Sequence, residues 1–216
     1  MATRKGRTVI TEKKPRFISY AAAVGKKESE GPLGKEFDRF FEDTTLGQDC
    51  WEKAESFLMK NAVMIALEKA GKGMEEIDGI FAGDLLNQCT GSAFALREFG
   101  IPFTGLYGAC STMALSLICA TLAIESGGMS TCIATTSSHF CSAEKQFRFP
   151  LEYGGQRAPT AQWTVTGSGA AVLSDSGDKA LPYIDKIHIG TIEDLGITDA
   201  ANMGAAMAPV DVKIEP

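Results

Sequence analysis

Apolar and polar positions alternate along this chain in a way that predicts interleaved strands and helices. Apolar stretches of strand length lie at residues 17–24, 79–83, 102–107, 131–136 and 165–173. Apolar residues also recur at helical spacing over 51–66, and small and apolar residues fill 113–124. Strands that alternate with helices favour an α/β fold with a largely parallel sheet. The pattern therefore predicts a βαβαβ unit with a mixed, mostly parallel five-stranded sheet, together with an edge strand at 183–189.

Residues 113–124 form the longest mostly apolar run of the chain. A membrane-spanning helix needs about 20 such residues, so this run is too short to cross a bilayer. We interpret it as a buried central helix of the fold, and we expect the protein not to cross a membrane.

The turn before this helix carries the most informative chemistry. Residues 108–112 read Gly-Ala-Cys-Ser-Thr, between a predicted strand and the central helix. At a helix N-terminus, unpaired backbone N–H groups favour a thiolate and would stabilise an oxyanion on a thioester. Cys110 is therefore a candidate nucleophile for acyl-group chemistry. The alternative is a buried cysteine that fills a gap between strand and helix.

Composition limits the class of protein. With 216 residues, of which 44% are hydrophobic, the chain is long enough to bury a core as one domain. Six cysteines are scattered without a C-x-x-C pair, and the two histidines are His139 and His188. This usage indicates a reducing, cytoplasm-type compartment and no metal site. No glycine-rich phosphate motif opens a helix, so we expect no cofactor.

Charge is distributed unevenly along the chain. Residues 1–27 contain eight Lys or Arg and one acid, whereas the remainder contains 13 bases and 26 acids. We predict that residues 1–16 form a basic, flexible arm. The arm is either solvated or lies on an acidic partner or an anionic membrane surface, which would make a peripheral membrane contact. We expect no nucleic-acid partner, because the acidic body would repel phosphates.

Several motifs along the chain are specific enough to indicate a family. The strand, the turn around Cys110 and the small-residue helix ending in Gly127-Gly128 are similar to the nucleophile segment of thiolases and ketoacyl synthases. The more specific motifs are EGPLG at 30–34, AGDLLNQ at 82–88, TSSH at 136–139, EKQFR at 144–148, EYGGQ at 152–156, TVTGSGA at 164–170 and DLGITD at 194–199. They extend over most of the chain, from about residue 17 to residue 209, and together they resemble the stage V sporulation protein AD family of the thiolase superfamily.

This resemblance implies a fold of two similar βαβαβ halves. Residues 17–209 would form the N-terminal thiolase-like domain, residues 210–216 would be a divergent tail, and the C-terminal half of the family would be absent. Since the central helices of the two halves pack together in such folds, we expect a homodimer or a partner chain to cover this one.

The resemblance also implies a function. Members of this family are spore proteins that bind dipicolinic acid and belong to the complex that moves it into the developing forespore. The expected partners are dipicolinate and the other subunits of this transport complex. The expected location is the forespore or spore, and a basic arm on a membrane would make the protein peripheral to the spore inner membrane.

A flat aromatic dianion requires fixed cations, an aromatic face and N–H donors. Lys145, Arg148 and Arg157 lie among aromatic residues in the long polar segment 137–162, and we interpret them as candidate ligand-binding residues. His139 and Asn87 each follow a predicted strand, and the carboxyl ends of parallel strands line the binding crevice in such sheets. The alternatives are a solvated basic loop, a structural histidine and an asparagine that caps a turn.

The competing hypothesis is an enzyme. A thioester-dependent acyltransferase or condensing enzyme would use Cys110 as nucleophile and would need a general base, for which His139 is the candidate in this chain. In catalytic relatives the second half supplies the His, Asn or second Cys that activates the nucleophile. We therefore expect a binding protein with an incomplete catalytic site, and keep the acyltransferase as the alternative.

Overall fold

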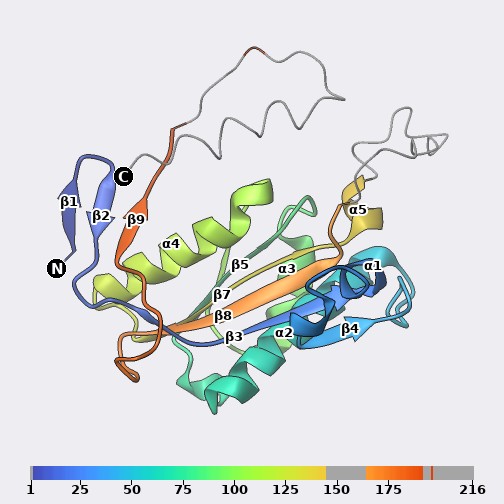
Figure 1. The fold of residues 1–216 in the computed structure, drawn as a ribbon, viewed down its shortest axis with the longest axis horizontal. Helices are drawn as coiled ribbons and strands as arrows, with labels where there is room; N and C mark the ends of the chain where they lie inside the picture. The colour runs from blue at the N-terminus through green and yellow to red at the C-terminus, as the bar shows by residue number, and fades with distance from the viewer. Residues whose placement is uncertain (1, 145–163, 192–195, 197–216) are drawn as a thin grey trace.

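A computed structural model describes residues 2–144, 164–191 and 196 of the protein (Figure 1). Its centre is a six-stranded mixed sheet with the order β4-β3-β8-β7-β5-β6. The strands are β3 (Arg16–Gly25), β4 (Arg39–Phe41), β5 (Gly79–Asp84), β6 (Phe103–Gly105), β7 (Thr131–Ser138) and β8 (Gly167–Ser174). The predicted α/β class is confirmed, but the sheet has six strands and not five. The extra strand, β4, was missed because three residues are too few to show a period.

Pairing in the sheet is mixed, as predicted. The pairs β3–β4, β5–β6 and β5–β7 are parallel. Strand β8 runs antiparallel to both of its neighbours, β3 and β7. The carboxyl ends of β5, β6 and β7 therefore meet at one edge of the sheet, which we call the carboxyl edge.

Helices cover both faces of the sheet (Figure 1). On one face, α2 (Trp51–Ala70) and α3 (Thr90–Leu96) pack over a core that includes Ile80, Ile133 and Val172. On the other, α4 (Thr112–Glu125) packs over Phe81, Cys132 and Leu173. These two sets occupy adjacent positions on the same strands, because successive side chains of a strand point to opposite faces.

Helix α2 ends where the sequence predicts. Gly71 adopts a left-handed conformation with φ of 62°, and its N–H binds the carbonyl of Glu68 while that of Lys72 binds Leu67. Glycine adopts this conformation without steric cost and is typical of a helix C-terminus.

Within the described part of the chain, the central helix α4 is buried by the sheet and, at Glu125, by the N-terminal segment. Its buried positions are Thr112, Ser116, Ala120, Thr121, Ile124 and Glu125. Away from the sheet, Leu122 is 39% exposed. The prediction of a buried central helix therefore holds only in part. The sheet covers the side of α4 that faces it, and the opposite side, with Leu122, is exposed. Among the described residues, we find no helix with both the length and the apolar character that crossing a bilayer requires.

The N-terminal residues are paired, where the sequence predicted a flexible arm. Strands β1 (Thr3–Lys5) and β2 (Thr8–Ile10) form a hairpin that joins β9 (Lys186–His188) in a separate three-stranded antiparallel sheet. The turn uses Gly6 at φ of 62°. Val9 lies opposite Ile187, which is 6% exposed. The predicted edge strand at 183–189 thus pairs with this hairpin, and burial of apolar residues outweighs the charge of the segment.

Candidate functional site

Cys110 lies on the turn between β6 and α4, as the sequence predicts. It is the central residue of a 3₁₀ turn, Ala109–Ser111, that leads directly into α4, and its side chain is exposed. Hydroxyl groups stabilise the turn: Ser111 Oγ donates to the carbonyl of Gly108 at 2.7 Å, and Thr112 Oγ1 donates to that of Ala109 at 2.7 Å. The thiol is therefore accessible at the start of a fourteen-residue helix.

The cysteine turn rests against the end of β5. The N–H of Leu106 binds the carbonyl of Ala82 at 2.8 Å. A Cβ atom at Gly83 would lie 2.0 Å from the carbonyl oxygen of Leu106 and 2.7 Å from Cγ2 of Thr112. Only glycine fits this approach, so the glycine of the 82–88 motif positions the turn that carries Cys110.

A second turn follows β5 and carries Asn87. Its Nδ2 donates to Oε2 of Glu55, on α2, at 2.7 Å. The next residues, Gln88 and Cys89, have positive φ angles of 52° and 67°. Cys89 Sγ contacts the carbonyl oxygen of Leu106 at 3.1 Å, which joins this turn to the cysteine turn.

Backbone strain is concentrated in these two turns. Gln88, Cys89 and Ala109, next to Cys110, are three of the five non-glycine residues with positive φ that are described. Left-handed backbone at such residues costs on the order of 1 kcal/mol each, and it clusters at binding and active sites. The strain is a feature of the site that apolar periodicity does not reveal.

Glu55 is the residue of this region that sequence reasoning missed. It is 1% exposed and accepts hydrogen bonds from Asn87, from Ser137 Oγ at 3.1 Å and from Ser142 Oγ at 2.8 Å. Burial, with a smaller contribution from the charge of Asp84, raises the pKa of Glu55 to about 7. A signal was present, because Glu55 is one turn before Leu58 and Met59 on the apolar side of α2.

Asp84, at the end of β5, is a second buried carboxylate on the same side. It is fully buried and accepts hydrogen bonds from the N–H of Cys89 at 3.3 Å and of Ser92 at 3.1 Å. These bonds fix the turn between β5 and α3. Burial, followed by the charge of Asp84, raises the pKa of the Cys89 thiol, so this thiol is a poor nucleophile.

His139 is a hydrogen-bonded core residue. It is fully buried; its Nε2 lies 2.7 Å from the carbonyl oxygen of Thr44, and its Nδ1 accepts from the N–H of Cys141 at 3.2 Å. These partners assign the proton to Nε2 and leave the ring neutral. Burial also lowers the pKa of His139. Both ring nitrogens are therefore occupied.

His139 and Cys110 lie on different sides of the sheet. In β7, Ile133 belongs to the core under α2 and Cys132 to the core under α4. Ser137 follows Ile133 by an even number of residues, and it reaches Glu55 on α2. His139 continues this series, whereas Cys110 begins the helix on the opposite face. The arrangement expected of a base next to its nucleophile is not formed between these two residues.

The remaining candidate residues, Lys145, Arg148 and Arg157, lie outside the described residues. The structure thus joins Asn87 to Glu55 and sets the Asn87 turn beside the Cys110 turn. In residues 2–144, 164–191 and 196, we find no group of three or more His, Cys, Asp or Glu side chains arranged to hold a metal ion.

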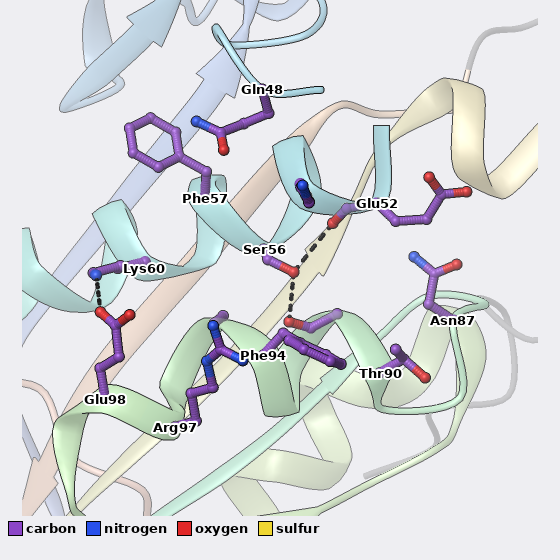
Figure 2. Close-up of a pocket in the computed structure, with 13 residues that line it drawn as sticks. Gln48, Glu52, Ser56, Phe57, Lys60, Asn87, Thr90, Phe94, Arg97 and Glu98 are labelled. Carbon is purple, nitrogen blue, oxygen red and sulfur yellow. Dashed lines mark hydrogen bonds and ion pairs between the residues drawn. The ribbon is translucent and has the colours of Figure 1, made fainter. Parts of the chain in front are cut away.

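A groove of about 560 Å³ opens between α2 and α3 on the outer surface. Figure 2 shows Asn87 at one end and the ion pair of Lys60 with Glu98 at the other. Ser56 Oγ connects the helices through the carbonyl of Gly91, at 2.8 Å. The groove and the buried carboxyl of Glu55 therefore share Asn87.

Comparison with known proteins identifies the family. Residues 5–214 match the sequence model of Stage V sporulation protein AD (SpoVAD). The protein of that name from Bacillus subtilis (strain 168) is 45% identical over 197 residues, which cover 90% of this chain. This chain belongs to the SpoVAD family. It is a sporulation protein, and it spans 57% of the length of that relative.

Solved structures give the fold of this SpoVAD-family chain. The 3-oxoacyl-[acyl-carrier-protein] synthase III of Aquifex aeolicus VF5 aligns with a TM-score of 0.54 at 18% identity, over 76% of this chain and 55% of that protein. Cerulenin-bound OleA of Xanthomonas campestris aligns with a TM-score of 0.51 at 13% identity, over 80% of this chain and 60% of that protein. At such identities the likeness shows a thiolase-like fold, as predicted, and nothing about activity.

Proposed function

We propose that this chain binds dipicolinate and takes part in its uptake into the developing forespore. The observation that carries the proposal is membership of the SpoVAD family along residues 5–214, including the motifs around Asn87 and Cys110. The site we assign to the ligand is the carboxyl edge of the sheet, where the two strained turns meet.

The carboxyl edge offers some of the groups that a negatively charged ligand needs. The amide of Asn87 has a second hydrogen beyond the one that it donates to Glu55, and the start of α4 provides a partial positive charge. Glu55 and Asp84 are acidic, however, and would repel a dianion when both are ionised. Binding therefore needs cations from elsewhere, and Lys145, Arg148 and Arg157 are the residues we propose.

Acyl transfer from a thioester to Cys110 is the second candidate function. The exposed thiol at the start of α4 favours it. Against it, His139 uses both ring nitrogens in other hydrogen bonds and lies under the other face of the sheet. A general base would have to come from residues other than His139, and we regard binding as the better supported function.

Partners and location belong to the same proposal. We assign the protein to the spore, in a complex with the other subunits of the dipicolinate transporter, and propose that a second copy or a partner chain covers the outer side of α4. The three-stranded sheet of β1, β2 and β9 displays Arg4, Lys5, Arg7 and Lys186, and would mediate any peripheral contact with the inner membrane.

Titration calorimetry tests the proposal directly. The chain is titrated with dipicolinate, with isophthalate as a control that has the same two carboxylates but no ring nitrogen, and with acetyl-CoA. Saturable binding of dipicolinate and no acyl transfer to Cys110 by mass spectrometry support a binding protein. Acetylation of Cys110 without dipicolinate binding would instead support the acyltransferase.

A further inference from the structure

One carboxyl group connects three elements of the carboxyl edge to α2. Oε2 of Glu55 accepts hydrogen bonds from Asn87, on the turn after β5, and from Ser142, on α5 (Phe140–Glu144). Oε1 accepts from Ser137, near the end of β7. The residue is 1% exposed, so these contacts are shielded from water. Removal of this carboxyl would separate α5 and the Asn87 turn from the long helix.

We propose that Glu55 is a positioning residue of the candidate site, and that binding and release of its proton changes how tightly α5 and the Asn87 turn are held. The inference rests on the proposed function in one respect: the Asn87 turn, which Glu55 holds, belongs to the edge that we assign to the ligand. What Glu55 does to α5 does not depend on the ligand.

The surroundings of Glu55 disfavour its charge. In the part of the chain that the structure describes, the charged groups that face it are Glu52, on α2, and Asp84, at the end of β5. Ser137 and Ser142 are its contacts from β7 and α5, and the nearby His139 is neutral. Burial, opposed by the Ser142 and Ser137 hydrogen bonds and reinforced by Asp84 and Glu52, raises the pKa of Glu55 from 4.5 to about 7.

This direction determines the effect of pH. We call the arrangement in which Glu55 is buried and hydrogen-bonded to Asn87 and Ser142 the closed arrangement. Between pH 4.5 and about 7, Glu55 holds a proton in the closed arrangement, whereas a Glu55 exposed to water would lose it. The closed arrangement is therefore most stable below about pH 4.5 and loses stability as pH rises to about 7, where the loss levels off. Opening of α5 should increase over this window by up to about tenfold per pH unit.

Ser142 allows both protonation states to be hydrogen-bonded. Its Oγ lies 2.8 Å from Oε2 of Glu55 and 3.1 Å from the carbonyl oxygen of His139. One hydroxyl hydrogen serves one acceptor at a time. With Glu55 ionised, Ser142 donates to it; when Glu55 takes a proton from solvent, its O–H donates to Ser142 Oγ, and Ser142 donates to His139. The carboxyl thus exchanges one proton with water while α5 stays in place.

Cys141 reports on α5 without any ligand, because it lies in this helix and its thiol is partly exposed. Its labelling by a pyridyl disulfide, followed by peptide mapping and divided by the rate for glutathione, measures opening at each pH. We expect the normalised rate of the unchanged chain to rise from pH 5 to 7, by up to about tenfold per unit, and then level off. Glu55→Gln should show no such rise, and Glu68→Gln, an exposed acid on the same helix, should match the unchanged chain.

The same rise in Glu55→Gln as in the unchanged chain would overturn the proposal. If that variant does not fold, Ser142→Ala provides a second test, since it removes the α5 donor and keeps Glu55. Its Cys141 should label several-fold faster at pH 5 than that of the unchanged chain. An unaltered rate would also overturn the proposal.

Calorimetry with dipicolinate at pH 6 and pH 8 separates the two proposals. The ligand remains a dianion over this range, so a change in affinity reports on the protein. We expect tighter binding at pH 6 in the unchanged chain and equal binding at both in Glu55→Gln. Equal binding at both pH values in the unchanged chain would show that Glu55 does not position the site. No binding at either pH would refute the proposed function, while Cys141 labelling would still judge the role of Glu55.

Discussion

Gly83 and Leu106 approach so closely that a Cβ atom on Gly83 would lie 2.0 Å from the carbonyl oxygen of Leu106. This contact holds the cysteine turn against the end of β5. It also explains why a glycine occupies a strand position that is fully covered on both sides, where a side chain would otherwise add to the core.

Gly83→Ala should therefore destabilise the protein and displace the cysteine turn. The obstacle is backbone, which cannot rotate away, and overpacking of this kind costs about 1–3 kcal/mol or more. Gly169→Ala is the matched control, because Gly169 lies in β8 and a Cβ there would have nothing within 4 Å. Thermal unfolding measures both variants. Equal melting temperatures for the two would show that the turn is free to move away.

Much of the fold could be predicted from the sequence because local patterns encode it. The runs that form β5, β7 and α4 are apolar, and Gly71 ends α2 where the period ends. Strand β4 and the β1–β2 hairpin have no such signal. Strand β9, which pairs with β2, comes from a distant part of the chain, and β4 pairs with residues of β3 that precede it by 16 positions. Whether three residues form a strand depends on these partners.

The site was predictable only in part, for the same reason. A helix start after a glycine turn located Cys110. The contact of Glu55 with Ser142 joins residues 87 positions apart, and no local pattern indicates it. For His139, the sequence correctly predicted a position at the end of a strand. It did not predict the face of the sheet on which His139 lies, because that depends on the register of β7.

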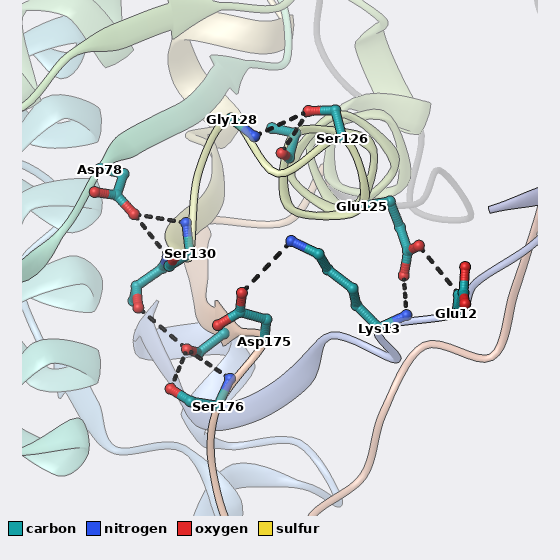
Figure 3. Close-up of polar contacts among 12 residues, drawn as sticks. Glu12, Lys13, Asp78, Glu125, Ser126, Gly128, Ser130, Asp175 and Ser176 are labelled. Carbon is teal, nitrogen blue, oxygen red and sulfur yellow. Dashed lines mark hydrogen bonds and ion pairs between the residues drawn. The ribbon is translucent and has the colours of Figure 1, made fainter. Parts of the chain in front are cut away.

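Glu125 anchors the N-terminal segment to the end of α4 (Figure 3). Its Oε1 accepts from the N–H of Lys13 at 2.8 Å, and its Oε2 from that of Glu12 at 3.1 Å. Hydrogen bonds to a charged group contribute about 1.5–3 kcal/mol. Glu125→Ala should therefore lower the melting temperature by roughly 3–12 °C in a chain of this size.

Two further variants test that explanation. Glu125→Gln keeps one acceptor and should lose less stability than Glu125→Ala. Glu68→Ala, an exposed acid on α2, should leave the melting temperature nearly unchanged. If Glu125→Ala has the same melting temperature as the unchanged chain, the N-terminal segment is held by β9 and not by Glu125.

Cys110 should be the most reactive of the six thiols. Cys132 is buried, which raises its pKa to about 12, and burial also raises the pKa values of Cys89 and Cys119. Cys50 is the informative competitor, because it is exposed and precedes α2. Asp49 and Glu52 lie beside it in sequence, whereas the stretch around Cys110, between Glu98 and Glu125, contains no acid.

Limited alkylation with iodoacetamide at neutral pH, followed by peptide mapping, ranks these thiols. We expect Cys110 to be modified first. Cys50 also lies at a helix N-terminus, that of α2, so its faster modification would show that the Cys110 turn confers no special reactivity, and would remove the main support for acyl transfer.

Arg148→Ala should weaken dipicolinate binding. A charge-assisted contact of about 1.5–3 kcal/mol corresponds to a loss of roughly tenfold to hundredfold in affinity. Arg7→Ala, in the N-terminal sheet, removes the same charge at a distance from the proposed site and serves as the control. Calorimetry that finds equal affinities for Arg148→Ala and the unchanged chain would move the site away from the 144–148 motif.

The outer side of α4 should make the chain self-associate. Leu122 is 39% exposed there, on a helix whose residues are mostly apolar, and burial of such a side chain is worth about 1.5–3 kcal/mol. Leu122→Lys should shift the protein toward a monomer in sedimentation velocity. Met64→Lys changes a side chain that is 44% exposed on α2, on the other face of the sheet, and should leave the association unchanged. A monomeric, cooperatively melting unchanged chain that binds no hydrophobic dye would contradict this prediction, because it would require α4 to be covered by residues of its own chain.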